Sequence, residues 1–224
     1  QSSRPKLKIV MIAPSLTSSL GNGAAATYRG LVRELSLRGH EVLFLERGAV
    51  RAHRDRPRLS FGRVEQYGGV TALNDRFGTE VRAADFVLVG SHISEAIEIG
   101  EWVTRNAQGA TAFYDLDSPG TLANLKQGKG GYLSAALIPR YRMYLSFTGG
   151  PLLEQIENEF GSPMARPLYS SVDARLYFPE HPQLEWDLGY LGAYSRERQS
   201  GLERLFIEPA RRWNEGRFVV AGSQ

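Results

Sequence analysis

The sequence predicts an α/β fold built on a doubly wound, mostly parallel sheet. Short apolar runs rich in β-branched residues alternate along the chain with helical patterns. The first run, at 6–13, is apolar on both faces, as expected for a strand inside a parallel sheet. A helical pattern at 24–38 ends at Gly39, and a second apolar run follows at 41–46. Strand, helix and strand in this order form the right-handed crossover unit of doubly wound sheets.

The alternation continues through the first 170 residues. We expect weaker strands at 64–67, 85–89, 111–114, 143–147 and 165–169. We expect helices at 94–106, 121–127 and 151–160. The stretch 47–61 is rich in arginine and has no periodicity, so we expect a surface loop there.

A change of composition predicts a domain boundary. Residues 171–183 have no helical period and carry Pro179 and Pro182, as a linker would. We therefore expect a Rossmann-like domain at 1–170, a linker at 171–183 and the incomplete start of a second domain at 184–224. In that last part we expect a strand at 186–191, a helix at 196–213 and a strand at 217–222.

Composition excludes several classes of protein. The 42% hydrophobic residues exclude overall disorder, and a net charge of only +3 argues against nucleic acid as a partner. The chain has no cysteine, and its four histidines lack the spacing of metal ligands, so we expect no metal site. The apolar runs are far shorter than the ~20 residues of a membrane helix. We expect a cytoplasmic protein.

Two glycines and an asparagine, Gly21, Asn22 and Gly23, lie between the first strand and the first helix. In a doubly wound fold this loop lies at the ligand-binding edge of the sheet, and the helix N-terminus behind it offers N–H groups to an anion. The pattern also satisfies GxGxxA, with Glu46 near the position of a ribose-binding acid. Dinucleotide binding and a plain structural turn are therefore alternatives, although residues 14–20 lengthen the turn beyond the dinucleotide fingerprint.

Two carboxylates, Asp115 and Asp117, follow the strand expected at 111–114. Strand alternation predicts that they point to the same side, toward the ligand crevice. One of them would act as general base toward an acceptor hydroxyl if its surroundings raise its pKa. The alternative is that Asp117 or Ser118 only caps the helix that begins near Pro119.

Further candidates occupy equivalent places on other strands. His92 follows one strand, and a helix N-terminus follows Thr148, Gly149 and Gly150. In the second domain, Ser195 and Arg198 begin a helix and suit a diphosphate. Each has an alternative without a ligand: His92 would be a surface histidine, residues 148–150 would form only a tight turn, and Arg198 would face solvent.

Five segments in order give the chain a family resemblance. They are 8–23, 114–117, 145–150, 168–179 and 187–199. Together they resemble the CgeB-like glycosyltransferases, a retaining GT-B group named for spore-maturation proteins. The resemblance implies a bacterial enzyme with two Rossmann-like domains, of which the first binds mainly the acceptor and the second the nucleotide-sugar. It implies no cofactor and no metal to hold the diphosphate.

The resemblance also implies roles for individual segments. The loop from Gly21 to Gly23 would approach the donor phosphates and sugar. The segment 114–117 lies where related enzymes carry a histidine near the transferred sugar, so Asp115 or Asp117 would contact sugar or acceptor there. The acceptor would carry a hydroxyl, on a sugar, a lipid-linked glycan, a protein or a small molecule.

Other expectations concern the chain as a whole. The family places its main donor-contacting acidic motif beyond residue 224, so we expect this chain alone to be inactive. An exposed edge strand at 218–221 would allow pairing into a homo-oligomer. The alternatives of a different class are a non-catalytic α/β binding module and an NAD(P)-dependent Rossmann enzyme.

Overall fold

A computed structural model describes residues 5–16, 23–48, 60–129, 131–175, 177–179, 183–192 and 196–222. The chain divides into two compact units, Gln1–Tyr177 and Phe178–Gln224. The division falls inside the segment 171–183, where the sequence changes character. Each unit is described separately.

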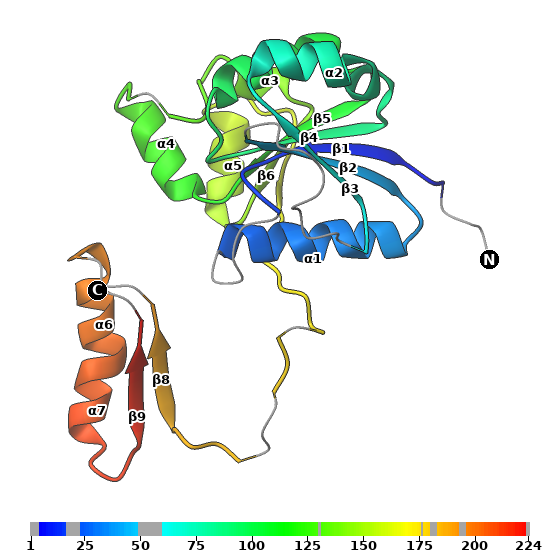
Figure 1. The fold of residues 1–224 in the computed structure, drawn as a ribbon. Coiled ribbons are helices and arrows are strands. Elements are labelled where there is room, and N and C mark those ends of the chain that lie inside the picture. Colours follow the sequence, from blue (N-terminus) through cyan, green and yellow to red (C-terminus); the bar gives the residue numbers. More distant parts are fainter. Residues whose placement is uncertain are drawn as a thin grey trace. The chain divides into compact units, whose positions relative to one another are not determined.

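The first unit is built on a parallel sheet (Figure 1). Within the described residues its strands are β1 (Lys8–Ile12), β2 (Glu41–Arg47), β3 (Arg63–Tyr67), β4 (Phe86–Gly90), β5 (Ala110–Asp115), β6 (Met143–Ser146) and β7 (Ala165–Pro167). Their order across the sheet is β3-β2-β1-β4-β5-β6-β7, and every neighbouring pair is parallel. The order reverses between β1 and β4, as in doubly wound folds. The predicted α/β, Rossmann-like fold class is confirmed.

Helices cover both faces of this sheet. They are α1 (Gly23–Leu37), α2 (Val70–Ala83), α3 (Ala96–Asn106), α4 (Ser118–Lys126), the 3₁₀ turn η2 (Ile138–Arg140) and α5 (Pro151–Asn158). Figure 1 shows α1 on one face of the sheet and α2 and α3 on the other. No described helix is long and apolar enough to cross a membrane.

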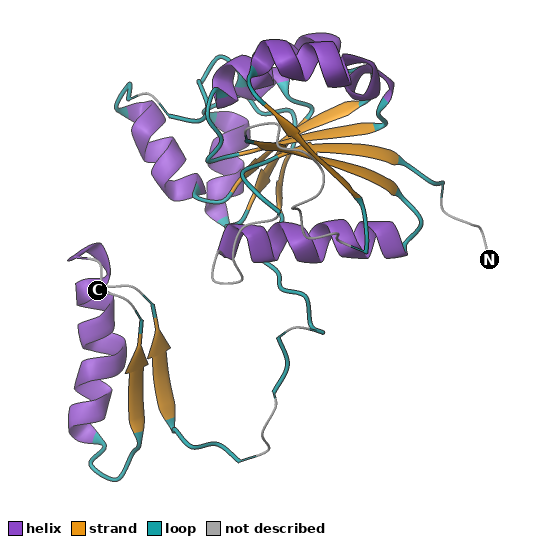
Figure 2. Cartoon of the chain, viewed as in Figure 1, coloured by secondary structure: helices purple, strands orange, loops and turns teal. Residues whose placement is uncertain are grey.

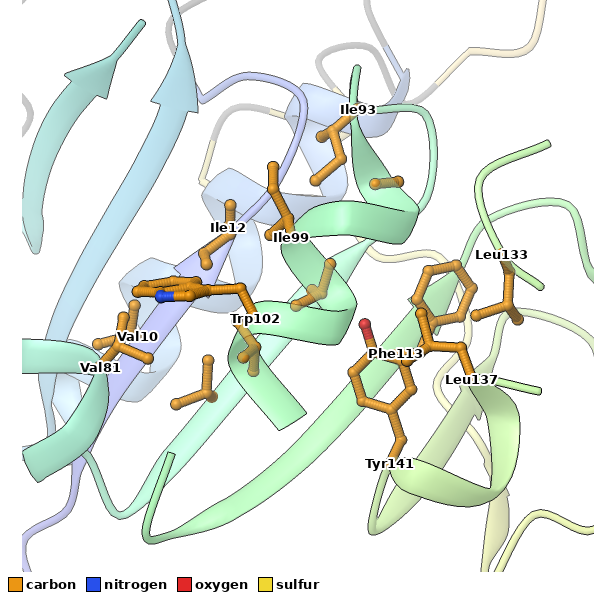
Figure 3. Close-up of a cluster of buried hydrophobic side chains, with 14 of the residues drawn as sticks. Val10, Ile12, Val81, Ile93, Ile99, Trp102, Phe113, Leu133, Leu137 and Tyr141 are labelled. Atoms are coloured by element: carbon orange, nitrogen blue, oxygen red, sulfur yellow. The ribbon is translucent and has the colours of Figure 1, made fainter. Parts of the chain in front are cut away.

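The strands divide their side chains between two hydrophobic cores. Val10 and Ile12 face α2 and α3, where they join Trp102 of α3 (Figure 3). The intervening Met11 faces α1 and packs in the other core with Tyr28. Because successive side chains of a strand point to opposite faces, a strand covered on both sides must be apolar at every position. This explains the unbroken apolar run that identified β1.

Helix α2 is the main element that the sequence analysis did not identify. It buries Leu73, Phe77 and Val81, which are spaced four residues apart along one stripe. Its remaining positions are mostly polar, Gly78 lies in its middle, and no side chain caps its start at Gly69. With so narrow an apolar stripe and no N-cap, the helical pattern is weak.

Several expected boundaries differ in detail, among them those of α4 and β2. Helix α4 begins at Ser118 rather than at 121, because Pro119 suits the first turn of a helix. Strand β2 continues to Arg47, which the sequence analysis placed in a loop. Residues 49–59 of that expected loop lie outside the described residues.

The second unit is a parallel strand–helix–strand unit (Figure 2). Strands β8 (Leu188–Leu191) and β9 (Phe218–Ala221) flank η3 (Arg196–Arg198), α6 (Gln199–Leu202), the π-helical turn η4 (Glu203–Ile207) and α7 (Glu208–Arg212). The expected single helix at 196–213 is therefore interrupted. Pro209 lacks an N–H group, so the regular hydrogen bond to residue 205 is missing where the helix widens.

A small aromatic cluster holds this unit together. The Phe206 ring lies 6.4 Å from the Tyr190 ring and 6.2 Å from the Phe218 ring, and Trp213 lies 5.8 Å from Phe218. Even Phe206, the most buried of the unit's described large hydrophobic residues, keeps 9% of its surface exposed. The unit has a short core and a largely exposed surface.

Candidate functional site

The described residues that directly follow β1, β2, β4, β5 and β6 lie at the carboxyl-terminal edge of the sheet. In open α/β sheets ligands bind outside this edge, close to the point where the strand order reverses. That point lies between β1 and β4. The loops after these two strands and after β5 therefore define the candidate site.

The loop after β1 is fixed by a buried carboxylate. Glu46, near the end of β2, is 2% exposed and accepts hydrogen bonds from the Leu16 amide at 2.9 Å and the Ser15 hydroxyl at 3.1 Å. The Arg29 guanidinium of α1 donates to the Leu16 carbonyl at 3.1 Å. Glu46 thus serves the protein's own loop, which argues against a ribose-binding role.

The predicted glycine loop is only partly described. Gly21 and Asn22 lie outside the described residues. Gly23 is the first residue of α1, where it is exposed and where a Cβ atom would meet nothing within 4 Å. The protein itself therefore does not require glycine at this position.

The two candidate carboxylates differ sharply in environment. Asp115 is fully buried, and its carboxylate accepts hydrogen bonds from the Tyr144 hydroxyl and, at 2.9 Å, from the Asp117 amide. Asp117 is exposed and directly precedes α4. Strand alternation does not extend to Asp117, because β5 ends at Asp115, and the two carboxylates lie in different environments.

Asp117 occupies the N-cap position of α4 without the expected hydrogen bond. Its side chain makes no cap to the helix, and its Oδ2 atom lies against the Cα of Gly120, where a Cβ would collide with it. Asp117 is therefore the carboxylate of this pair that solvent or a substrate reaches. Asp115 instead holds the loop that carries Asp117.

The charge of Asp115 acts on two buried tyrosines, Tyr144 and Tyr28. Burial is the main cause that raises the pKa of Tyr144, and the Asp115 charge and hydrogen bond raise it further. Burial, with the charges of Tyr114 and Asp115, also raises the pKa of Tyr28. The Tyr28 hydroxyl has no hydrogen-bond partner among the described residues and occupies the space where Gly90 lacks a side chain.

A serine pair ties the loop after β5 to the loop after β6. The Oγ atoms of Ser118 and Ser146 lie 2.8 Å apart, and both residues are fully buried. Ser146 Oγ also accepts from the Thr148 amide at 3.0 Å and lies 2.7 Å from the Thr148 carbonyl oxygen. The starts of α4 and α5 are thereby held together.

The predicted Thr148–Gly149–Gly150 turn lies at this edge, partly open to solvent. Gly150 has φ of +77°, in the region that favours glycine, directly before Pro151 begins α5. Gly149 lies beneath the Tyr169 hydroxyl, so a side chain at 149 would collide with that hydroxyl. The glycines are thus explained by turn geometry and close packing.

His92 lies in the strained loop after β4. His92 and Glu95 have φ of +64° and +58°, and within the described residues they are the non-glycine residues with positive φ. The His92 ring stacks on Tyr132 with centroids 4.5 Å apart, and its Nδ1 lies 2.9 Å from Ser91 Oγ. Glu95 forms an ion pair with Arg47 at the end of β2.

Four further residues at this edge were not predicted from the sequence: Ser91, Glu95, Arg47 and Tyr132. Ser91 is fully buried, and its Oγ accepts a hydrogen bond from the Leu116 amide at 3.0 Å. The position of Ser91 directly after a strand was the only feature of the sequence that could have marked it as a site residue. The partnerships of Tyr132 and Arg47 depend on segments far apart in the chain, and no local pattern reveals them.

In the second unit, one predicted residue is described. Ser195 lies outside the described residues. Arg198 is exposed in the turn before α6 and lines a hollow of about 510 Å³ with Tyr190 and Phe206. An exposed guanidinium over a hollow is compatible with the predicted contact to an anion.

A larger cavity lies elsewhere. It has a volume of about 770 Å³ and lies at the amino ends of β1 and β2, the edge opposite the candidate site. Its charged residue Glu41 is already paired with Lys6, and Arg63 lies 3.3 Å from Glu65. Fold topology therefore favours the carboxyl edge despite the larger volume here.

No group of three or more potential metal-ligating side chains occurs in the part of the chain that the structure describes. No family model matches the sequence, and no curated protein matches it significantly.

Solved structures match the fold at low sequence identity. An alpha-glucosyltransferase in complex with UDP and a 13-mer DNA containing a HMU base is 14% identical, with a TM-score of 0.57 over 99% of this chain. An alpha-glucosyltransferase in complex with UDP is 13% identical, with a TM-score of 0.56 over 98% of this chain. The chain spans 58% and 59% of the lengths of these two structures. At such identity the likeness establishes the fold.

Proposed function

We propose that this chain belongs to a GT-B glycosyltransferase that transfers a sugar from a nucleotide-diphosphate sugar to a hydroxyl acceptor. The observation that carries the proposal is the fold match, which extends over nearly the whole chain to alpha-glucosyltransferases in complex with UDP. The sequence resemblance to CgeB-like enzymes supports it independently. That resemblance also supports retention of configuration and a mechanism without a metal.

The proposed chemistry rests on stabilising the departing diphosphate. Helix α1 directs its N-terminus toward the carboxyl edge of the sheet, and helix N-termini favour anions there. Arginine side chains such as Arg198 would supply charge in the second unit. Donors positioned in advance where negative charge develops commonly give the largest contribution to catalysis.

Asp117 and Asp115 would have different roles in this reaction. Asp117, which is exposed, would orient an acceptor hydroxyl or accept its proton. Asp115, which is buried under the Tyr144 hydroxyl, would act as a positioning residue for Asp117. The first unit would thus serve mainly the acceptor, and the second unit the nucleotide-sugar.

We propose further that this chain alone has little or no transferase activity. The chain spans 58% of the length of an alpha-glucosyltransferase with this fold. Its second unit contains one strand–helix–strand unit in the described residues. A donor site needs more surface than this unit presents.

The direct test is release of nucleoside diphosphate from a panel of nucleotide-sugars, measured with this chain and with a protein that adds a complete second domain. We expect turnover by the longer protein and little by this chain. Asp117→Asn in the longer protein should lower kcat, while Asp75→Asn, an exposed acid of α2, should not. Absence of turnover by the longer protein with every nucleotide-sugar would contradict the proposed transferase activity. Robust turnover by this chain would contradict the proposal that the chain alone has little or no activity.

The acceptor is proposed to be something other than nucleic acid. One matching structure contains DNA, so this point requires its own test. The net charge of +3 provides little of the basic surface that supplies most of the affinity for DNA. We expect no salt-dependent binding of duplex DNA; tight binding would contradict the proposal.

A further inference from the structure

A second hollow opens at the carboxyl edge, beside the strained loop after β4. It has a volume of about 490 Å³ and lies between the loop 93–95, the first turn of α3, α4 and residues 131–132. Its principal lining side chains are Ile93, Glu95, Ile97, Glu98, Asn124 and Tyr132. The volume is within the usual range for a small-molecule site.

The lining combines an aromatic ring with unused hydrogen-bonding groups. Tyr132 is 37% exposed, and its stacking on His92 limits the movement of the ring. Glu98 and Asn124 are exposed, and neither side chain has a hydrogen bond or ion pair among the described residues. A carboxylate and a carboxamide together offer acceptors and donors to neighbouring hydroxyl groups.

The charge of the hollow selects against anions. Glu95 is neutralised by its ion pair with Arg47, whereas Glu98 has no cationic partner among the described residues. The hollow therefore carries a negative charge, which repels a phosphate or a carboxylate. A diphosphate is thus disfavoured, and an uncharged ligand with many hydroxyl groups is favoured.

We propose that this hollow binds an uncharged sugar ring, with the ring's C–H groups against Tyr132 and its hydroxyls on Glu98 and Asn124. The aromatic ring and the two isoleucines suit the less polar face of a sugar, while the acid and the amide suit its hydroxyl edge. The identification of this sugar as the acceptor rests on the proposed function. The binding of a neutral sugar does not.

The test measures the binding of maltose, cellobiose, lactose and glucuronate to the chain. Saturation-transfer NMR detects the binding, and calorimetry gives the Kd. We expect a neutral disaccharide to bind with Kd of about 1 mM, which is about 4 kcal/mol. Tyr132→Ala should weaken binding about tenfold, as the loss of an aromatic contact does. Tyr132→Phe, which keeps the ring, should bind within about twofold of the parent.

Two further variants test the polar contacts. Asn124→Ala should also weaken neutral-sugar binding. Glu98→Gln should retain neutral-sugar binding and improve the relative affinity for glucuronate, because the repelling charge is removed. Tyr177→Ala, at a tyrosine with similar exposure of 43%, is the matched control and should bind like the parent.

The outcomes separate this inference from the transferase. Failure of all three disaccharides to bind, or binding that survives Tyr132→Ala unchanged, would overturn the sugar site. Preference for glucuronate by the parent chain would also overturn it. Neutral-sugar binding that requires Tyr132, in a protein without nucleotide-sugar turnover, would support the site and contradict the transferase.

Discussion

At the scale of single residues, buried polar groups determine the shape of the carboxyl edge. Asp115 is a carboxylate without solvent contact, and it remains acceptable in the interior because the Tyr144 hydroxyl and the Asp117 amide donate to it. Residue type and place indicated that Asp115 lies at a strand end. They did not indicate its burial, because its main donor, Tyr144, is 29 residues away in the chain.

Replacing Tyr144 tests this account. Tyr144→Phe removes the donor and leaves the buried carboxylate poorly satisfied, so we expect a loss of about 1–3 kcal/mol in unfolding free energy. Urea unfolding measures it. Tyr141→Phe is the matched control, since the Tyr141 hydroxyl is equally buried but has no partner among the described residues. Equal effects of the two variants would contradict the role of Asp115.

Alkaline pH provides a second test at this scale. Burial raises the pKa of Tyr67 from 10.0 to about 12, although the charge of Arg47 opposes the shift. Because the unfolded state loses this proton first, the stability it contributes is present below pH 10 and is lost as pH rises from 10 to about 12.

The Tyr67→Phe variant should therefore lose less stability across this pH range. Burial raises the pKa of other tyrosines as well, so the loss of stability with rising pH should become smaller in the variant rather than disappear. Denaturant unfolding at several pH values measures it, with tyrosinate absorbance as a check. A parent chain whose stability is constant over this range would show that the Tyr67 hydroxyl is not buried in solution.

At the scale of elements, side chains from one strand fix the loops of another. Glu46 of β2 holds the loop after β1, and the Ser118–Ser146 contact ties the start of α4 to the loop after β6. The sequence predicted β1 and β2 because unbroken apolar runs mark them, and α1 because its apolar residues follow a helical period. It did not predict α2, whose stability comes from tertiary packing of three apolar side chains rather than from caps or composition.

Removing the Glu46 carboxylate should loosen the loop after β1. We expect Glu46→Ala to cost about 1–3 kcal/mol, because the Leu16 amide loses its buried acceptor. Hydrogen exchange at the Leu16 amide should accelerate more than exchange within α3. Glu101→Ala, which removes an exposed partner of Arg105, is the control and should cost less than about 1 kcal/mol. Unchanged exchange at Leu16 would contradict the proposed anchoring.

At the scale of the whole chain, the two units differ in how much surface they bury. The first contains two cores on the two faces of its sheet, and the second contains a small aromatic cluster. Sequence composition indicated the change near residue 171 because prolines and a lack of period mark it. The candidate site was harder to predict, since the His92–Tyr132 ring contact joins residues 40 positions apart in the chain and follows no local motif.

The two hydrophobic cores of the first unit predict that this unit folds without the second. A chain cut after Tyr177 should unfold cooperatively, with a midpoint close to that of the first unit in the full chain. Circular dichroism and denaturant titration of both proteins measure this. A cut chain that lacks a cooperative transition would show that the first unit requires residues 178–224.

The measurement that tests the central proposal most directly is thermal unfolding with ligands, of this chain and of a protein extended by a complete second domain. The panel is nucleoside diphosphates, nucleotide-sugars and NAD(P). We predict that one nucleoside diphosphate stabilises the extended protein, by about 2.7 kcal/mol at 100 times its Kd, and has little effect on this chain. Stabilisation of this chain by NAD(P), with no response to any nucleoside diphosphate, would contradict the glycosyltransferase and indicate a dinucleotide site.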